Sequence, residues 1–343
     1  MAARSPRAAA VCELLEIHDM CAAHEAGDER IVPAVQQQQR VWAVGDYEET
    51  DCIGGGVVQA RCRVSGEIVA VKRGDGKETA GMMREAELLA ICGGHPSVVA
   101  LQALVEEPET GEVVSLVMEH AGPSLHEVLR IGRRGRPLRE EEVRRVMRSL
   151  IAGVEHMHSL RVIHRDIKPA HILAGGVIGA VKICDLGQAV SLSEPPPYGR
   201  VGTRRYMAPE ILLGKADYCP KVDMWSVGCV MAELLAGKPL FDGEDDTKQL
   251  LEIFDVLGVP FSSTHWPAYA SLPLAGKVVT PPCILHCNRL RDIFNDHLLS
   301  NDGFAVLDGL LSCDIDRRLS AAAALKLPWF AYADVTERAI PSA

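Results

Sequence analysis

From about residue 41 the pattern of apolar and polar positions becomes strand-like. The alternation is clearest over 67–72, where successive side chains fall on opposite faces. Two further stretches, 98–105 and 112–119, also predict strands and are separated by turn-forming residues. Between the first of these strands and the second, 79–91 predicts a short helix that ends near two glycines. This part of the chain therefore predicts a small β-rich unit with one helix.

The period of the pattern becomes helical after residue 123. From 143 to 157, apolar residues recur every three or four positions on one stripe, and three arginines lie off it. The stretch 222–236 is apolar on nearly all sides, which predicts a buried central helix with Gly237 as its stop signal. Three prolines at 195–197 predict an extended loop. A larger, mostly helical unit therefore follows the β-rich one.

These patterns predict an α+β fold with two lobes of unequal size. Residues 1–40 are expected to be an N-terminal extension, helix-prone or disordered, because they end in a polar run of glutamines. The β-rich lobe is expected to span 41–118, and 119–122 would connect it to the helical lobe at 123–332. A C-terminal tail would take up 333–343.

The composition is that of an ordinary globular protein. Of 343 residues, 48% are hydrophobic and 24% are charged, which argues against a disordered chain. Lys and Arg number 36 against 46 Asp and Glu, so the formal net charge is −10. This balance gives no general attraction to nucleic acid or to an anionic membrane, and no stretch approaches the roughly 20 apolar residues of a membrane span. We therefore expect neither as a partner.

The cysteines and the N-terminus bear on the compartment. There are 11 cysteines with no CxxC pair, and a chain of this length needs no disulfide framework, so we expect reduced thiols in a cytoplasmic or nuclear protein. Arg4, Ser5 and Arg7 are typical of a transit peptide, but Glu13 and Glu16 soon follow and no apolar signal region is present. Organelle import is the less favoured alternative.

The strongest chemical signal is His-Arg-Asp-Ile-Lys-Pro at 164–169. Five specified residues in such a window have a chance probability on the order of 10⁻⁷ per starting position at average composition. Other motifs stand in a fixed order around it: Val-Ala-Val-Lys at 69–72, a strand that ends in Asp-Leu-Gly at 185–187, Ala-Pro-Glu at 208–210, and Val-Asp-Met-Trp-Ser-Val-Gly at 222–228. Over residues 47–330 this order resembles the eukaryotic protein kinase family, which implies its bilobal fold.

The resemblance assigns roles that suit phosphoryl transfer, where charge on the transferred group must be held and neutralised. Lys72 would reach the α- and β-phosphates of ATP, and a carboxylate on the following helix would fix it. Glu85 is the candidate, with Glu87 as a rival. Asp166 would accept the proton of the substrate hydroxyl or orient it, and Lys168 would neutralise the γ-phosphate.

The same resemblance implies a site for ATP and Mg²⁺. Asp185 would hold the metal ion, Met118 would be the gatekeeper, and Ala70 and Leu173 would sandwich the adenine. Backbone groups at the hinge and residues of the glycine-rich loop would complete the nucleotide site: Ile53, Gly54, Gly56 and Val58 in the loop, and Glu119, His120 and Ala121 in the hinge.

Later segments look like those of cyclin-dependent kinases, in particular 222–234, 239–243, 249–260 and 314–324. The resemblance implies serine/threonine specificity, a protein substrate and a cyclin-like regulatory partner. It also implies a buried structural ion pair between Arg318 and Glu210, two residues that lie far apart in the sequence.

Several positions depart from the family pattern. His171 stands where the family has a metal-binding Asn, and imidazole suits softer metals than Mg²⁺, so His171 is a doubtful metal ligand. The glycine-rich loop is about three residues short. The segment between Lys72 and Glu85 is about five residues shorter than in cyclin-dependent kinases, which weakens the expectation of cyclin binding.

The segment that follows Asp185 departs as well. Tyr198 stands where the resemblance expects a phosphorylated Thr, and Ser191 and Ser193 are alternative acceptors. Arg84 and Arg165 could clamp such a phosphate, but the third arginine of that cluster is replaced by Val190. Met207 replaces an Arg that shapes the proline-selecting pocket in the subfamily, whereas Thr203 stands where it should brace Asp166 and Lys168.

Two functions from different classes are consistent with this sequence. The first is a cyclin-dependent kinase-like serine/threonine protein kinase, weakened by His171 and the short glycine-rich loop. The alternative is a pseudokinase that acts as a partner-binding or scaffold module. A small-molecule kinase is a third and weaker hypothesis, because Ala-Pro-Glu and the segment before it look protein-directed. The residues that favour the enzyme are Lys72, Glu85, Asp166, Lys168 and Asp185.

Overall fold

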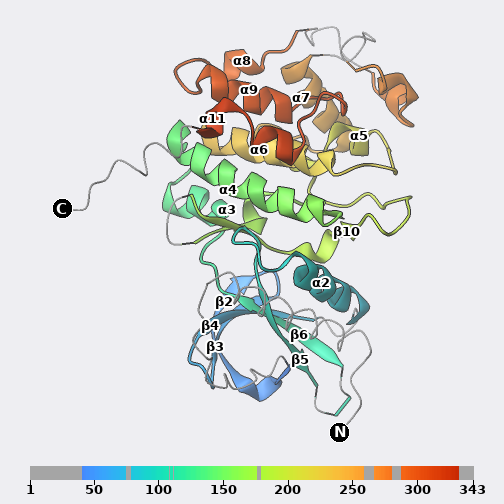
Figure 1. The fold of residues 1–343 in the computed structure, drawn as a ribbon. Helices are drawn as coiled ribbons and strands as arrows, with labels where there is room; N and C mark the ends of the chain where they lie inside the picture. Colours follow the sequence, from blue (N-terminus) through green and yellow to red (C-terminus); the bar gives the residue numbers. More distant parts are fainter. Residues whose placement is uncertain are drawn as a thin grey trace, which may run out of the picture. The chain divides into compact units, whose positions relative to one another are not determined.

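The computed structural model describes residues 41–74, 79–107, 109–110, 112–175, 179–258, 266–279 and 287–331. The predicted extension at 1–40 and tail at 333–343 lie outside these residues. The chain forms two compact units (Figure 1). The first contains the residues up to 121 together with 184–187, and the second contains 122–183 and the residues from 188 onward. Each unit is described by itself.

The first unit is built on a six-stranded sheet with the strand order β1-β5-β6-β4-β3-β2. Its elements are β1 (Val41–Ala43), the 3-10 turn η1 (Val44–Asp46), β2 (Tyr47–Gly54), β3 (Val57–Cys62), β4 (Ile68–Arg73), α2 (Thr79–Cys92), β5 (Leu101–Glu106) and β6 (Val113–Glu119). β1 pairs in parallel with β5, and the other neighbours are antiparallel. Strands β4 to β6 and the helix were predicted by their ranges, whereas β1, β2 and β3 were not.

The core of this unit lies on the face to which the alternating apolar residues point. Val69 and Val71 of β4 are buried there with Val105 and Val117 of the neighbouring strands. β5 begins at Leu101, three residues later than predicted, because the chain first turns where the Val98 N–H bonds to the His95 carbonyl.

The second unit is mainly helical (Figure 1). Its helices are α3 (Leu125–Glu127), α4 (Glu140–Ser159), α5 (Pro209–Leu212), α6 (Lys221–Ala236), α7 (Asp246–Leu257), α8 (Leu290–Ile293), α9 (Asn301–Leu310), α10 (Ala321–Ala324) and α11 (Pro328–Ala331). A π-helical segment, η2 (Val128–Gly132), and short 3-10 turns lie between them: η3 (Pro169–His171), η5 (Arg204–Tyr206), η6 (Tyr269–Ser271) and η7 (Ala275–Lys277). The turn η4 (Leu186–Gln188) begins in the first unit and ends in this one. Four short strands complete the unit: β7 (Val162–Ile163), β8 (Ile172–Ala174), β9 (Val181–Ile183) and β10 (Val190–Ser191).

The central helix α6 is buried along almost its whole length, from Val222 to Leu235, as its uniformly apolar sequence predicts. It ends at Gly237, whose φ of 73° is the left-handed conformation that glycine adopts without strain. α4 packs against α6 through its predicted apolar stripe, which is buried throughout. The α+β, two-lobed fold is thus confirmed. The eight cysteines among the described residues are free thiols.

Two small antiparallel strand pairs support the residues that carry chemistry. β7 pairs with β10, and β8 pairs with β9. The loop from 164 to 171 runs between β7 and β8, so both of its ends are fixed by strands. Asp185 follows β9 by two residues. Short paired strands therefore hold these two segments in defined positions.

Candidate active site

Asp166 lies at the centre of a hydrogen-bond network in the second unit. Its Oδ1 accepts hydrogen bonds from the backbone N–H of Thr203 at 2.8 Å and from the Thr203 hydroxyl at 2.7 Å. Its Oδ2 accepts from Lys168 Nζ at 2.8 Å, and Lys168 also donates to Thr203 Oγ1 at 2.9 Å. Asp166 is 8% exposed. Bonds to a charged donor and to a backbone N–H fix the orientation of the buried carboxylate, since both oxygens are engaged.

Gly202 allows Thr203 to approach Asp166. Its φ is 103°, and a Cβ at this position would collide with the carbonyl oxygen of Arg165. Any other residue would push the segment away from the loop, so glycine is required for this close approach. Arg165 itself has a φ of 69°, which is an uncommon conformation for a residue with a side chain.

Asp223 of α6 binds the backbone of the loop at 164–171 through its carboxylate. Its Oδ1 accepts from the N–H of Arg165 at 2.8 Å, and its Oδ2 accepts from the N–H of His164 at 2.9 Å. Its Oδ2 also lies 2.9 Å from His158 Nε2. Burial would raise the pKa of the Asp223 carboxyl, but the hydrogen bond and charge of His158, with those of His164, hold that pKa below its ordinary value.

The role of Asp223 was not predicted from the sequence, although a signal was present. An Asp inside a helix that is otherwise apolar on all sides must find partners when it is buried. Its partners here are two backbone N–H groups of the loop that carries Asp166.

His171 also contacts Asp166. Its Nδ1 lies 3.0 Å from the Asp166 carbonyl oxygen and 3.5 Å from Oδ2. A carbonyl oxygen only accepts hydrogen bonds, so the Nδ1 of His171 carries the proton in this contact. The side chain thus braces the backbone of Asp166. A protonated nitrogen is not a metal ligand, and imidazole is a poor partner for Mg²⁺, so this nitrogen does not fit the magnesium site.

The first unit holds the second group of charged residues. Lys72 of β4 donates to both oxygens of Glu85 on α2 at 2.8 Å and to Asp185 Oδ1 at 2.7 Å. The side chains are 24%, 5% and 38% exposed, respectively. Burial alone would lower the pKa of Lys72, but the charges and hydrogen bonds of Glu85 and Asp185 together raise it above its usual value.

Gly187 leaves room for this group of three. A Cβ on Gly187 would lie 3.3 Å from oxygens of both Asp185 and Glu85, and 3.6 Å from Lys72 Nζ. Asp185 itself adopts a φ of 62°. The sequence order Asp-Leu-Gly therefore places a carboxylate beside Lys72 and keeps the space next to it clear. The structure brings Lys72 together with Glu85 as the sequence predicted, and not with the rival Glu87.

The predicted glycine-rich loop is a tight hairpin between β2 and β3. Gly54 pairs with Val57, so only Gly55 and Gly56 form the turn, with φ of 61° and 77°. Such a two-residue turn with two positive φ values is strongly favoured by glycine. The loop residues Ile53, Gly54 and Gly56 are exposed, and Val58 is partly buried. The short sequence thus produces a short hairpin.

The remaining predicted nucleotide residues lie on different elements. In the first unit, Ala70 of β4 is directly opposite Met118 of β6, and both are buried. Glu119 bonds back to Ala100 through its backbone N–H at 3.0 Å, and its side chain accepts from the N–H of Ala100 at 2.8 Å. Ala121 ends the first unit, and Leu173 lies on β8 in the second.

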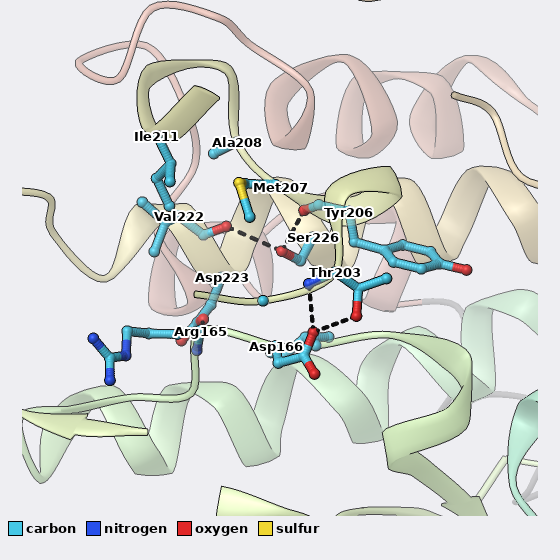
Figure 2. Close-up of a pocket in the computed structure, with 12 residues that line it drawn as sticks. Arg165, Asp166, Thr203, Tyr206, Met207, Ala208, Ile211, Val222, Asp223 and Ser226 are labelled. Carbon is cyan, nitrogen blue, oxygen red and sulfur yellow. Dashed lines mark hydrogen bonds between the residues drawn. The ribbon is translucent and has the colours of Figure 1, made fainter. Parts of the chain in front are cut away.

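A small hollow, partly open to solvent, adjoins Asp166 in the second unit (Figure 2). Asp166 and Thr203 lie along one side of it, and Met207, Ile211 and Val222 line another. Met207, which stands where the resemblance expects an arginine, is thus one of the residues that line the hollow beside Asp166.

The described residues contain no group of three or more His, Cys, Asp and Glu side chains placed to hold a metal ion. Asp185 nevertheless fits Mg²⁺ chemically, because it offers carboxylate oxygen and is 38% exposed. No helix within the described ranges is long and apolar enough to cross a membrane.

A β-rich unit with a Lys–Glu–Asp group and a helical unit with a buried Asp–Lys–Thr network define a protein kinase fold. Residues 47–330 match the family model described as "Protein kinase domain". The chain belongs to the protein kinase family.

The chain is similar to several cyclin-dependent kinases. It is 45% identical over 316 residues to the Oryza sativa protein named "Putative cyclin-dependent kinase F-2", covering 86% of this chain and 93% of that one. It is 37% identical over 310 residues to "Cyclin-dependent kinase G1" of Arabidopsis thaliana, covering 84% of this chain but only 49% of that protein. The yeast structure titled "Crystal Structure of the yeast RNA Pol II CTD kinase CTDK-1 complex" matches with a TM-score of 0.76 and 26% identity, over 88% of this chain and 97% of that one.

These findings confirm the predicted family, the cyclin-dependent kinase-like subfamily and the predicted enzyme class. The protein is a cyclin-dependent kinase-like serine/threonine protein kinase. Nothing in the comparisons supports the pseudokinase alternative. Protein kinases as a family use ATP and Mg²⁺.

Proposed function

We propose that Asp166 accepts or orients the hydroxyl of a serine or threonine in a protein substrate while the γ-phosphate of ATP is transferred to it. The observation that carries this assignment is the fixed orientation of the Asp166 carboxylate between Thr203 and Lys168. A general base must be held within hydrogen-bond reach of the proton that it takes. Lys168 supplies a positive charge next to that position for the transferring phosphoryl group.

The nucleotide is assigned to the first unit. Lys72 would hold the α- and β-phosphates, Glu85 would orient Lys72, and Asp185 would hold Mg²⁺, which supplies charge neutralisation when bound. This assignment is supported by the contacts of Lys72 with the two carboxylates. The adenine would lie against Ala70, beside Met118 and the backbone of Glu119 and Ala121, with the hairpin residues Ile53, Gly54, Gly56 and Val58 completing the part of the site in this unit.

The substrate and partner assignments rest on likeness to the relatives and on the residue at position 207. Because Met207 stands where the subfamily has the arginine that shapes its proline-selecting pocket, we assign the enzyme to substrates that are not strictly proline-directed. The names of the relatives support a cyclin-like regulatory partner, although the short segment between Lys72 and Glu85 departs from the subfamily. A cytoplasmic or nuclear location is consistent with its free thiols.

The test is transfer of radiolabelled phosphate from ATP and Mg²⁺ to a generic protein substrate. Asp166→Asn should reduce the rate by ~10²-fold or more, the usual contribution of a general base, while the exposed Asp292→Asn should leave it unchanged. A wild-type rate equal to that of Asp166→Asn at background would contradict the assignment.

His171→Asn, in the same assay, tests the interpretation that the imidazole weakens metal binding. The substitution restores the amide oxygen of the family pattern, so the transfer rate should rise by ~10²-fold, or about 2.7 kcal/mol of barrier. Thermal stabilisation by ATP, measured with and without Mg²⁺, reports nucleotide binding separately. No shift in either condition would contradict the nucleotide site itself.

A further inference from the structure

Arg165, which directly precedes Asp166, is held by groups of the protein itself. Its Nε donates to the Gln188 carbonyl, and its Nη1 donates to the Tyr218 hydroxyl at 3.0 Å. In Figure 2 its side chain points away from the hollow that adjoins Asp166. The guanidinium thus anchors the loop without a charged partner in these two contacts, where the sequence predicted a phosphate clamp.

Tyr218 joins this anchor to the segment that carries Thr203. Its hydroxyl accepts the bond from Arg165 and donates its own proton to the Gly199 carbonyl at 2.8 Å. Tyr218 is 3% exposed and the two bonds are partly buried, so water can replace a lost bond only in part. The Tyr218 hydroxyl therefore links the side chain of Arg165, which precedes Asp166, to the carbonyl of Gly199, which lies four residues before Thr203.

Tyr198 adds a second brace to the same segment. Its ring lies against the ring of Tyr218, with centroids 5.3 Å apart. Its N–H donates to the Ala216 carbonyl at 2.8 Å, and its hydroxyl donates to the Glu194 carbonyl at 3.1 Å. The hydroxyl that the sequence offered as a phosphate acceptor is therefore already used in holding the segment.

We propose that Tyr218 is a positioning residue for Asp166, and that its hydroxyl holds the segment at 199–203 against the catalytic loop without phosphorylation of Tyr198. Tyr218 is connected to Asp166 by two routes, one through Arg165 and one through Gly199. Arg165 is bonded covalently to Asp166, and Gly199 leads through Gly202 to Thr203, whose two hydrogen bonds fix Asp166. This inference rests on the assigned role of Asp166.

The experiment compares Tyr218→Phe with Tyr269→Phe, a matched control that removes another hydroxyl donating to a backbone carbonyl. Tyr218→Phe should lower kcat about ten-fold, equivalent to about 1.4 kcal/mol, with the KM for ATP unchanged. Tyr269→Phe should leave kcat within two-fold. Treatment of the wild type with a phosphatase should also leave kcat within about two-fold, because no phosphate is needed.

Hydrogen exchange gives a readout that does not depend on activity. In Tyr218→Phe without nucleotide, the amide of Thr203 should exchange at least about ten-fold faster than in wild type, because its segment has lost an anchor. Unchanged kcat and unchanged exchange in Tyr218→Phe would overturn the inference. Loss of activity after phosphatase treatment would also overturn it. A wild type that shows no transfer, with faster exchange in Tyr218→Phe, would instead overturn the assigned function and leave the anchor intact.

Discussion

The two units each contain a cluster of opposite charges, and the clusters differ in how they are enclosed. In the first unit, Lys72 lies between Glu85 and Asp185, and Asp185 is 38% exposed. In the second unit, Arg318 donates to both oxygens of Glu210 at 2.7 and 2.8 Å, and both side chains are fully buried. The chemistry of the contacts is the same, but solvent reaches only the first.

Because of this difference in exposure, the first cluster can bind a ligand, whereas the second can only stabilise the fold. The first cluster brings two carboxylates to one ammonium, so a cation can be added where Asp185 reaches solvent. The buried pair is matched one to one, and Arg318 also donates to the Ser312 and Lys221 carbonyls, so its hydrogen-bonding capacity is used within the fold. We therefore expect changes in the first cluster to lower activity and changes in the second to lower stability.

Breaking the buried pair should have the largest effect. Arg318→Met leaves Glu210 buried without its partner, and we expect a loss of about 3–5 kcal/mol in the free energy of unfolding, measured with urea. The neighbouring Arg317 is 65% exposed, so Arg317→Met should change that free energy by less than about 0.5 kcal/mol. Equal losses in the two variants would mean that burial is not the deciding difference.

Glu85→Gln should have the next largest effect, and on a different property. Lys72 would keep Asp185 as a partner but lose its orienting carboxylate, so phosphate transfer should fall ~10²-fold, or about 2.7 kcal/mol of barrier. Glu87→Gln, on the same helix, is the control and should retain wild-type transfer. A larger loss in Glu87→Gln would show that the orienting residue was assigned wrongly.

Deprotonation of Lys72 at alkaline pH should have the smallest effect, and it should act on the free energy of unfolding. The pKa of Lys72 is raised, so its stabilising contribution is complete below the unfolded value of about 10.4 and is lost as the pH rises through the higher folded value. The stability of wild type relative to Lys72→Met should therefore shrink only above about pH 10.4, by at most about 1 kcal/mol. The guanidinium of Arg318 stays charged there, so the difference between wild type and Arg318→Met should not change. Urea titrations at pH 9 and 11 measure both.

The sequence was sufficient where a local pattern determines the outcome. The apolar run of α6 predicted its burial, and family register on α2 selected Glu85 over Glu87 as the partner of Lys72. The two-residue hairpin at Gly55 and Gly56 follows from the missing loop residues.

The sequence was insufficient where the partner is distant along the chain. Nothing local to Asp223 indicates that it binds the backbone at His164 and Arg165, 59 and 58 positions away. Tyr218 likewise meets Arg165 only through the tertiary fold. β1 is three residues long and pairs in parallel with β5, so its own pattern is too short to predict it.

The most direct test of the distinction between the clusters applies the same chemical change to both. Unfolding free energies of Glu85→Gln and Glu210→Gln are measured by urea titration under identical conditions. We predict a loss of about 1 kcal/mol or less for Glu85→Gln, because Lys72 keeps Asp185, and about 3 kcal/mol or more for Glu210→Gln, because Arg318 loses its buried counter-charge. Equal losses, or a larger loss in Glu85→Gln, would contradict the account.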